Sequence, residues 1–164
     1  MRHTQALSKE ASEADYDADR RLSQLGKQHA KAIALYLQTG QISPNPILCS
    51  PFIRCHETAE IIAGNLPYEI TPKPLTILAP GSGLDDLLRA IVNHGEGSRD
   101  WILCILHQPD VSNILGTLLC TDSNYTVPVQ NGDIFGLDVQ IKHGRRDAAL
   151  IFSYSIYNDK RLNA

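Results

Sequence analysis

The sequence predicts an α/β fold, a three-layer α/β/α sandwich around a mostly parallel central sheet. Four segments show apolar residues at helical spacing, short continuous apolar runs lie between them, and the two kinds of segment alternate through the middle of the chain. Continuous apolar runs are typical of strands buried on both faces, and their alternation with helices is typical of a layered fold with a parallel sheet. We expect residues 1–164 to form a single domain, because this length can bury a core of its own.

The expected helices follow the apolar spacing and its stop signals. The first begins at Gln24 and ends before Gly40, and the second runs from near Phe52 to residues 64–67. The third covers residues 85–92, and the fourth follows Pro109, a residue that suits the first turn of a helix.

The remaining apolar runs are the expected strands. They cover residues 47–49, 68–71, 101–106, 133–141 and 148–156, with a turn centred on Gly144 between the last two. The polar segment 8–21 is rich in acidic residues, so we expect an exposed loop there.

Composition excludes several functional classes. Eighteen acidic and fifteen basic residues give a net charge of −3, which disfavours binding to nucleic acid. No apolar run reaches the roughly 20 residues needed to span a bilayer, and the first residues lack the apolar core of a signal peptide, so we expect a cytoplasmic protein without membrane contact. The four cysteines, Cys49, Cys55, Cys104 and Cys120, lack CxxC spacing and suit buried free thiols.

Polar residues at the ends of the expected strands mark the candidate site. Ligands of parallel sheets bind beyond the carboxyl ends of the strands. Arg2-His3 opens the chain, Ser50 to Arg54 follows one strand, and His107-Gln108-Pro109 follows another. Two histidines and two arginines would thus meet at one rim, where helix N-termini favour anions.

These segments resemble the motifs of a known family. Arg2-His3 matches the RHG motif, residues 20–26 match RxL(S/T)xxG, residues 50–59 match SPxxRAxxTA and residues 107–109 match HxP, in the family order. With these motifs the sequence resembles the histidine phosphatase (phosphoglycerate mutase-like) superfamily, and within it the small SixA-type phosphohistidine phosphatases, over nearly the whole chain.

The resemblance implies a role for each matched residue. His3 would be the nucleophile, Arg2 and Arg54 would bind the phosphoryl oxygens, and His107 would hydrogen-bond the transferring group. Arg20 would bind substrate, with Arg21 as the alternative. No metal and no cofactor are implied.

Four features depart from the family pattern. The strand that normally precedes Arg-His is missing, so we expect either that the sequence starts late or that this first strand is truncated. Thr4 replaces the family glycine, Leu106 replaces a small residue, and the segment between His3 and Arg20 is longer than in compact members.

The sequence leaves the general acid and the substrate open. Asp85 and Asp86 are the candidates for the acid, although both also suit an ordinary helix start. We expect a monomeric phosphatase that works through a phosphohistidine intermediate on a protein phosphohistidine. The alternatives are a phosphatase for small phosphate esters and a catalytically impaired phosphate-binding module.

Overall fold

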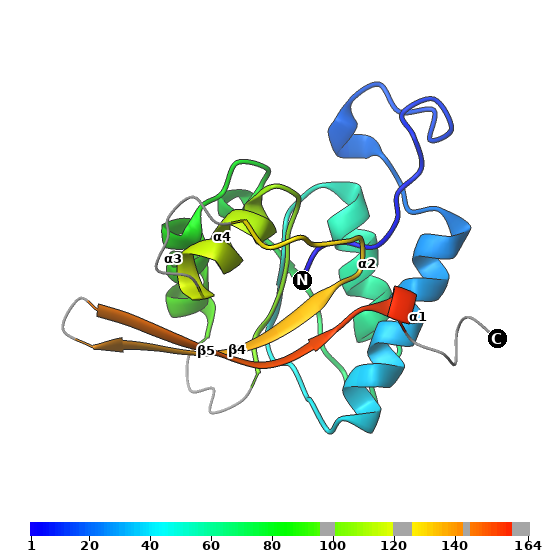
Figure 1. Cartoon of the computed structure of the whole chain (residues 1–164). Coiled ribbons are helices and arrows are strands. Elements are labelled where there is room, and N and C mark those ends of the chain that lie inside the picture. The colour runs from blue at the N-terminus through cyan, green and yellow to red at the C-terminus, as the bar shows by residue number, and fades with distance from the viewer. Residues whose placement is uncertain (96–100, 120–125, 143–144, 159–164) are drawn as a thin grey trace.

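The computed structural model describes residues 1–95, 101–119, 126–142 and 145–158 and shows a layered α/β arrangement (Figure 1). Helices α1 (Gln24–Thr39) and α2 (Ile53–Ala63) cover one face of the sheet, and α3 (Leu84–His94) and α4 (Asp110–Leu119) cover the other. The predicted fold class and the four predicted helices are confirmed. No helix among the described residues is long and apolar enough to cross a membrane.

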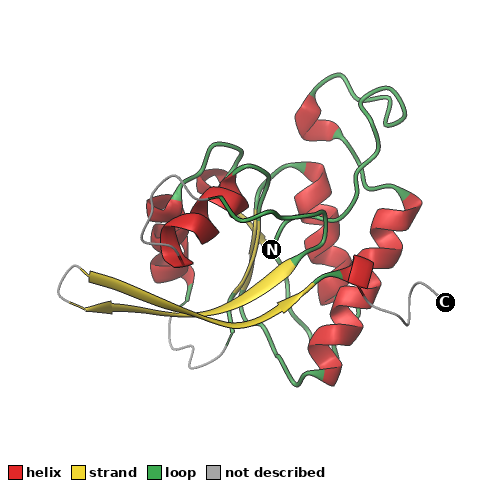
Figure 2. Cartoon of the chain, viewed as in Figure 1, coloured by secondary structure: helices red, strands yellow, loops and turns green. Residues whose placement is uncertain are grey.

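Among the described residues, three parallel strands pair in the order β2-β1-β3. In Figure 2 they are much shorter than the two long strands that extend to one side of the helices. The central strand of the three, β1 (Ile47–Cys49), is fully buried and pairs with β2 (Lys73–Pro74) on one side and β3 (Leu103–Ile105) on the other. Burial on both faces explains why β1 is continuously apolar in sequence.

The strand predicted at residues 68–71 is wrong, since the pairing begins only at Lys73. The side chains in this stretch nevertheless interact with the rest of the fold, because Ile70 packs on the core and the Tyr68 hydroxyl donates to the Pro44 carbonyl at 3.1 Å. Pro72 has no N–H to donate, which limits ladder formation just before β2.

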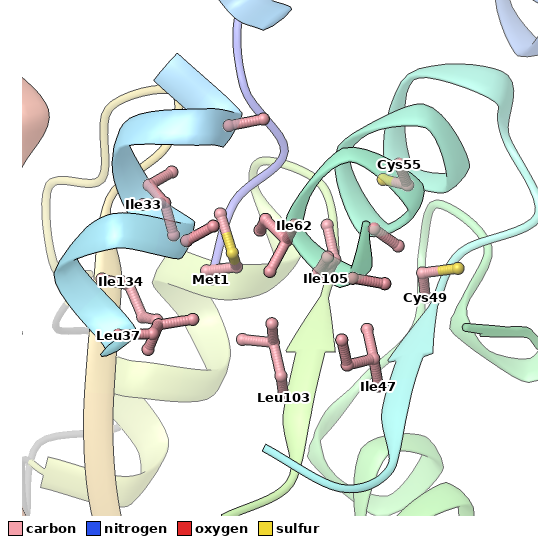
Figure 3. Packing of buried hydrophobic residues seen from close by; sticks show 14 of the residues in the cluster. Met1, Ile33, Leu37, Ile47, Cys49, Cys55, Ile62, Leu103, Ile105 and Ile134 are labelled. Carbon is pink, nitrogen blue, oxygen red and sulfur yellow. The ribbon is translucent and has the colours of Figure 1, made fainter. Parts of the chain in front are cut away.

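Side chains of β1 and β3 alternate between two apolar clusters. Ile47 and Ile105 face α1 and α2, where they meet Ile33 and Ile62 (Figure 3). Leu48 faces the opposite way, into the cluster under α3 and α4. Because successive side chains point to opposite faces, one short sheet packs against helices on both sides.

The late strands form a separate antiparallel pair, β4 (Ile134–Lys142) with β5 (Arg145–Tyr154). Both predicted strands are confirmed with shifted ends, and the turn predicted around Gly144 lies outside the described residues. Cys49, Cys55 and Cys104 are free thiols, as predicted, and Cys120 also lies outside the described residues.

The first three residues join the two sheets. Leu106 donates its N–H to the Met1 carbonyl at 3.0 Å, and its own carbonyl accepts from the His3 N–H at 3.1 Å. On the other side, the Arg2 N–H donates to the Asp133 carbonyl at 3.2 Å. The expected first strand is thus reduced to a single parallel bridge between Arg2 and Leu106, placed between β3 and the start of β4.

Helix α1 packs against the segment that follows this bridge, at a glycine. Ser23 caps the helix by accepting from the Gly26 N–H at 3.0 Å, and its own N–H donates to the Gln5 carbonyl at 3.0 Å. A Cβ on Gly26 would lie 2.0 Å from that same carbonyl oxygen. Only glycine permits this approach, which explains the glycine of the RxL(S/T)xxG segment.

We expect Gly26→Ala to lower the free energy of unfolding by about 1–3 kcal/mol, because the methyl group must displace backbone. Gly64→Ala is the matched control, since Gly64 is exposed, has a φ of −68° and would place its Cβ 3.2 Å from Glu60 O of the preceding turn. Its effect should stay within about 0.5 kcal/mol in urea denaturation. Equal stability of the two variants would contradict the proposed close contact.

Candidate active site

His3 and His107 lie side by side beyond the carboxyl end of β3. Their ring centroids are 5.4 Å apart, and both side chains are buried. The Arg2–Leu106 bridge places His3 directly beside the strand that leads into His107. The structure therefore brings together the first and third of the predicted segments.

The ring of His3 is held from both nitrogens. Nδ1 lies 2.7 Å from the Thr4 carbonyl oxygen, so Nδ1 carries the proton and donates it there. Nε2 is left with a lone pair and accepts from Nε of Arg54 at 3.2 Å. The His3 carbonyl accepts from the Gly132 N–H at 3.1 Å, which also fixes the backbone.

Burial lowers the pKa of His3 to about 3, and the nearby charges of Arg54 and Arg2 act in the same direction. The ring is therefore neutral at physiological pH. A neutral imidazole with an unprotonated Nε2 is the form that can attack phosphorus, once the substrate replaces Arg54 at that nitrogen.

His107 is held in the same way by its surroundings. Nε2 lies 2.7 Å from the Ser50 hydroxyl and 3.5 Å from Sγ of Cys55, and the ring packs against Phe52 at a centroid distance of 5.1 Å. Burial, followed by the charge of Arg54, lowers the pKa of His107 to about 4. Residues of the second predicted motif, which follows β1, thus contact the second histidine through polar groups and through an aromatic ring.

Arg54 lies in the first turn of α2 and is buried, with its guanidinium over the ring of Phe52 at 5.0 Å. Besides the contact with His3, Nη1 donates to the Asp17 backbone carbonyl at 2.7 Å. Nη2 donates to Asp17 Oδ2 at 2.9 Å. Arg54 therefore links the histidine to the loop that the sequence predicted to be exposed.

Asp17 also contacts Arg20, so its carboxylate joins two arginines. Nη1 of Arg20 donates to Asp17 Oδ1 at 3.0 Å, and Nε of Arg20 donates to the Leu7 carbonyl at 2.8 Å. These bonds, with that of Arg20 first, hold the pKa of Asp17 below its ordinary value. Sequence analysis missed Asp17 as a site residue, although its position three residues before Arg20 is the available signal.

Arg21, the alternative to Arg20, points elsewhere. Its guanidinium pairs with Glu57 on α2 at 3.0 Å and is largely exposed. Glu57 also accepts from the Leu22 N–H at 2.8 Å, which anchors the end of the loop to α2. Of the two arginines, Arg20 is therefore the one connected to Arg54.

The side chain of Arg2 makes one contact with the backbone of another segment. Its Nη1 donates to the Val129 carbonyl at 3.0 Å. Its charge lies close enough to contribute to the lowered pKa of both histidines. Arg2 thus adds to the positive potential at the histidine pair.

Thr4, where the family has glycine, is accommodated by α2. Its N–H donates to Oγ1 of Thr58 at 3.3 Å, and its hydroxyl lies 3.2 Å from the same atom. Thr58 in turn donates to the Arg54 carbonyl at 2.7 Å, so the hydroxyl of Thr4 is the donor to Thr58. Leu106, the other substitution, packs its side chain into the cluster under α3 and α4.

Asp86, a candidate general acid, caps α3. It accepts from the Gly83 N–H at 3.0 Å and lies 3.3 Å from Arg89, while Asp85 is exposed beside it. These contacts are those of acids at the positive end of a helix. No group of three or more potential metal ligands occurs within the described ranges.

An apolar cavity of about 590 Å³ lies among β3, β4, α3 and α4. Its lining includes Met1, Leu87 and Leu137 but none of the five site residues predicted from the sequence. The candidate site is therefore the histidine and arginine cluster at the strand ends rather than this cavity.

Comparison with known proteins supports a family. Residues 1–75 match the family model of the histidine phosphatase superfamily (branch 1). An uncharacterized protein of Picosynechococcus is 32% identical over 132 residues, which cover 77% of this chain and 78% of that protein.

Solved structures show the same fold at lower sequence identity. The protein histidine phosphatase SixA in complex with tungstate superposes with a TM-score of 0.76 at 22% identity and covers 94% of each chain. A putative phosphohistidine phosphatase SixA from Agrobacterium tumefaciens gives 0.71 at 20% identity, over 94% of this chain and 95% of that one. A mycobacterial glucosyl-3-phosphoglycerate phosphatase gives 0.68 at 18% identity, over 92% and 95%.

The two buried histidines predict a stability that falls in acid. Their pKa values in the folded protein are about 3 and about 4, below the value near 6.5 of an unfolded chain. Between about pH 6.5 and 4 the unfolded chain therefore binds more protons, so stability decreases as the pH falls, by up to about 1.4 kcal/mol per pH unit for each histidine.

The dependence of the free energy of unfolding on pH is measured by urea denaturation of the wild type and of His107→Gln at about pH 6.5 and about pH 5. The variant should lose less stability between the two conditions, because one of the buried histidines is gone. Identical losses in the two proteins would contradict a neutral, buried His107.

Proposed function

The chain belongs to the histidine phosphatase superfamily, and from this premise we propose that it is a phosphatase that transfers the phosphoryl group of its substrate to Nε2 of His3. One observation carries the proposal. His3 is neutral, its Nε2 lone pair is oriented by Arg54 and its Nδ1 proton is held by the Thr4 carbonyl. The same carbonyl stabilises the positive charge that the ring acquires once Nε2 bonds to phosphorus.

The reaction proceeds in two displacements at phosphorus. Nε2 attacks, the bond between phosphorus and the leaving group breaks, and the leaving group keeps the electron pair and takes a proton from solvent. Water then attacks the phosphohistidine and gives one proton back to solvent, the bond between phosphorus and Nε2 breaks, inorganic phosphate is released and the lone pair returns to His3. Neither displacement requires a metal or a redox partner.

The cationic residues supply the electrostatic stabilisation. Arg54 already contacts Nε2, so its guanidinium lies where the phosphoryl oxygens must come. Arg2 raises the local potential, and Arg20 joins the cluster through Asp17. His107 can pick up a proton once a dianion offsets the burial and the charge of Arg54 that lower its pKa, and then donates to the phosphoryl group.

For the substrate we propose a protein phosphohistidine. The acid beside Arg54, Asp17, is held in its ionised form and is a poor proton donor. An imidazole leaving group needs less acid catalysis than an alkoxide, because it leaves readily once protonated. The likeness in fold to SixA phosphatases agrees with this choice.

A small phosphate ester is the second candidate. The likeness in fold to the mycobacterial glucosyl-3-phosphoglycerate phosphatase supports it. The third candidate is an impaired phosphate-binding module, and it is motivated by Thr4 at the position of the family glycine. The hydroxyl of Thr4, however, donates to Thr58 on α2, which argues against this candidate.

The nucleophile is tested by rapid quench with a phosphohistidine peptide. The wild type should carry acid-labile, base-stable phosphate, and His3→Ala should carry none and lose at least about a thousandfold in kcat. His56→Ala, a change to a partly exposed histidine on α2, is the control and should retain the intermediate. Equal turnover by the wild type and His3→Ala would show that another group attacks phosphorus.

The substrate class is tested by comparing kcat/KM for a phosphohistidine peptide with values for sugar and alkyl phosphates. We expect the peptide to be preferred by about tenfold or more and Asp85→Asn to leave its turnover unchanged, because no alkoxide needs a proton. A preference for esters that is lost in Asp85→Asn or Asp86→Asn would favour the phosphomonoesterase.

A further inference from the structure

The carboxylate of Asp17 sits between two arginines in the manner of a bound oxyanion. One oxygen accepts from Arg20 at 3.0 Å and the other from Arg54 at 2.9 Å. The backbone carbonyl of the same residue accepts from the remaining terminal nitrogen of Arg54 at 2.7 Å. Both terminal nitrogens of Arg54 therefore contact Asp17.

A phosphoryl group bound by Arg54 would need the same nitrogens. The third Arg54 nitrogen, Nε, contacts Nε2 of His3, so all three guanidinium nitrogens are occupied, two of them by Asp17. The side chain of Arg54 is only 7% exposed, whereas that of Asp17 is 57% exposed. An exposed carboxylate thus lies over a buried guanidinium group.

We propose that Asp17 is the resident anion of the phosphate site, which substrate must displace, and that it thereby sets the affinity and the anion selectivity of the enzyme. The inference rests on the proposed function, because it takes the histidine and arginine cluster as the phosphate site. Once the carboxylate leaves, the freed donors of Arg20 and Arg54 both face the incoming group.

The local structure allows this displacement. Asp17 begins a single 3-10 turn, Asp17–Asp19, within the polar segment before Arg20. Besides the contacts of Asp17 with Arg54 and Arg20, the segment is held at its ends, where the Leu7 N–H donates to the Arg21 carbonyl at 2.9 Å and the Leu22 N–H donates to Glu57 at 2.8 Å. Moving the turn therefore breaks the arginine contacts of Asp17 without breaking these anchors.

The exchange also predicts a selectivity between anions. A phosphoryl dianion gains more from two guanidinium groups than a carboxylate does, so it can replace Asp17. A carboxylate ligand carries the same single charge as Asp17, so it gains no extra attraction to the arginines. It also competes at a disadvantage, because Asp17 is attached to the chain and the ligand is not. The site should therefore reject carboxylates and accept phosphoryl groups.

The test is calorimetric titration of the folded protein with inorganic phosphate, with steady-state kinetics on a phosphohistidine peptide beside it. Asp17→Asn should bind phosphate about fivefold more tightly than the wild type and show a lower KM, because the competing charge is gone. Asp19→Asn is the matched control, since it removes one charge from an exposed residue of the same turn. Acetate should bind measurably to Asp17→Asn only.

Each other outcome overturns the proposal. Weaker phosphate binding by Asp17→Asn would make Asp17 a residue that positions Arg54, and a lower kcat at constant KM would make it a proton donor. Unchanged binding, or equal gains in Asp17→Asn and Asp19→Asn, would leave Asp17 with no specific role at the site.

Titration in the His3→Ala background separates this inference from the proposed function. Phosphate affinity there still depends on Asp17 if the carboxylate is the resident anion, whatever group attacks phosphorus. Absence of phosphate binding in every variant would overturn both the site and the inference.

Discussion

The rest of the site depends on a few backbone hydrogen bonds made by the first three residues. Leu106 binds Met1 and His3 on one side, and Asp133 binds Arg2 on the other, so this segment joins the parallel sheet to the antiparallel pair. The bonds fix the backbone of His3 next to the strand that ends in His107. The first residues of the chain thus set the geometry between the two histidines.

That geometry determines the protonation of the site. Two buried imidazoles lie near the buried guanidinium of Arg54, and both burial and positive charge disfavour further protons. The positive charge that adds to the effect of burial on the histidines would also stabilise a phosphoryl dianion. Nucleophilicity and anion binding therefore share one contributing cause, the fixed positive charge of the arginines, while burial is the larger cause of the neutral histidines.

The sequence alone predicted the parts of the fold that local patterns determine. Apolar periodicity found all four helices and the buried strand β1, and strand-end placement found His3, Arg54 and His107 as neighbours. It placed β2 too early, because a two-residue strand is set by its pairing with Cys49 rather than by its own pattern. It also missed Asp17, because only the fold of a long loop brings that acid onto Arg54.

The position of Asp17 changes what the net charge of the chain means. Because the net charge is −3 in spite of this cluster of cations, acidic residues must outnumber basic residues in the rest of the chain. The predicted exposed loop contains several of these acidic residues. One acid of that loop, however, pairs directly with two arginines of the cluster, whereas Asp19 on the same turn is exposed. A buried arginine such as Arg54 needs a counter-ion, and a carboxylate attached to the chain provides one at a cost in ligand affinity. The affinity for phosphate therefore depends on how easily one short turn moves away from Arg54.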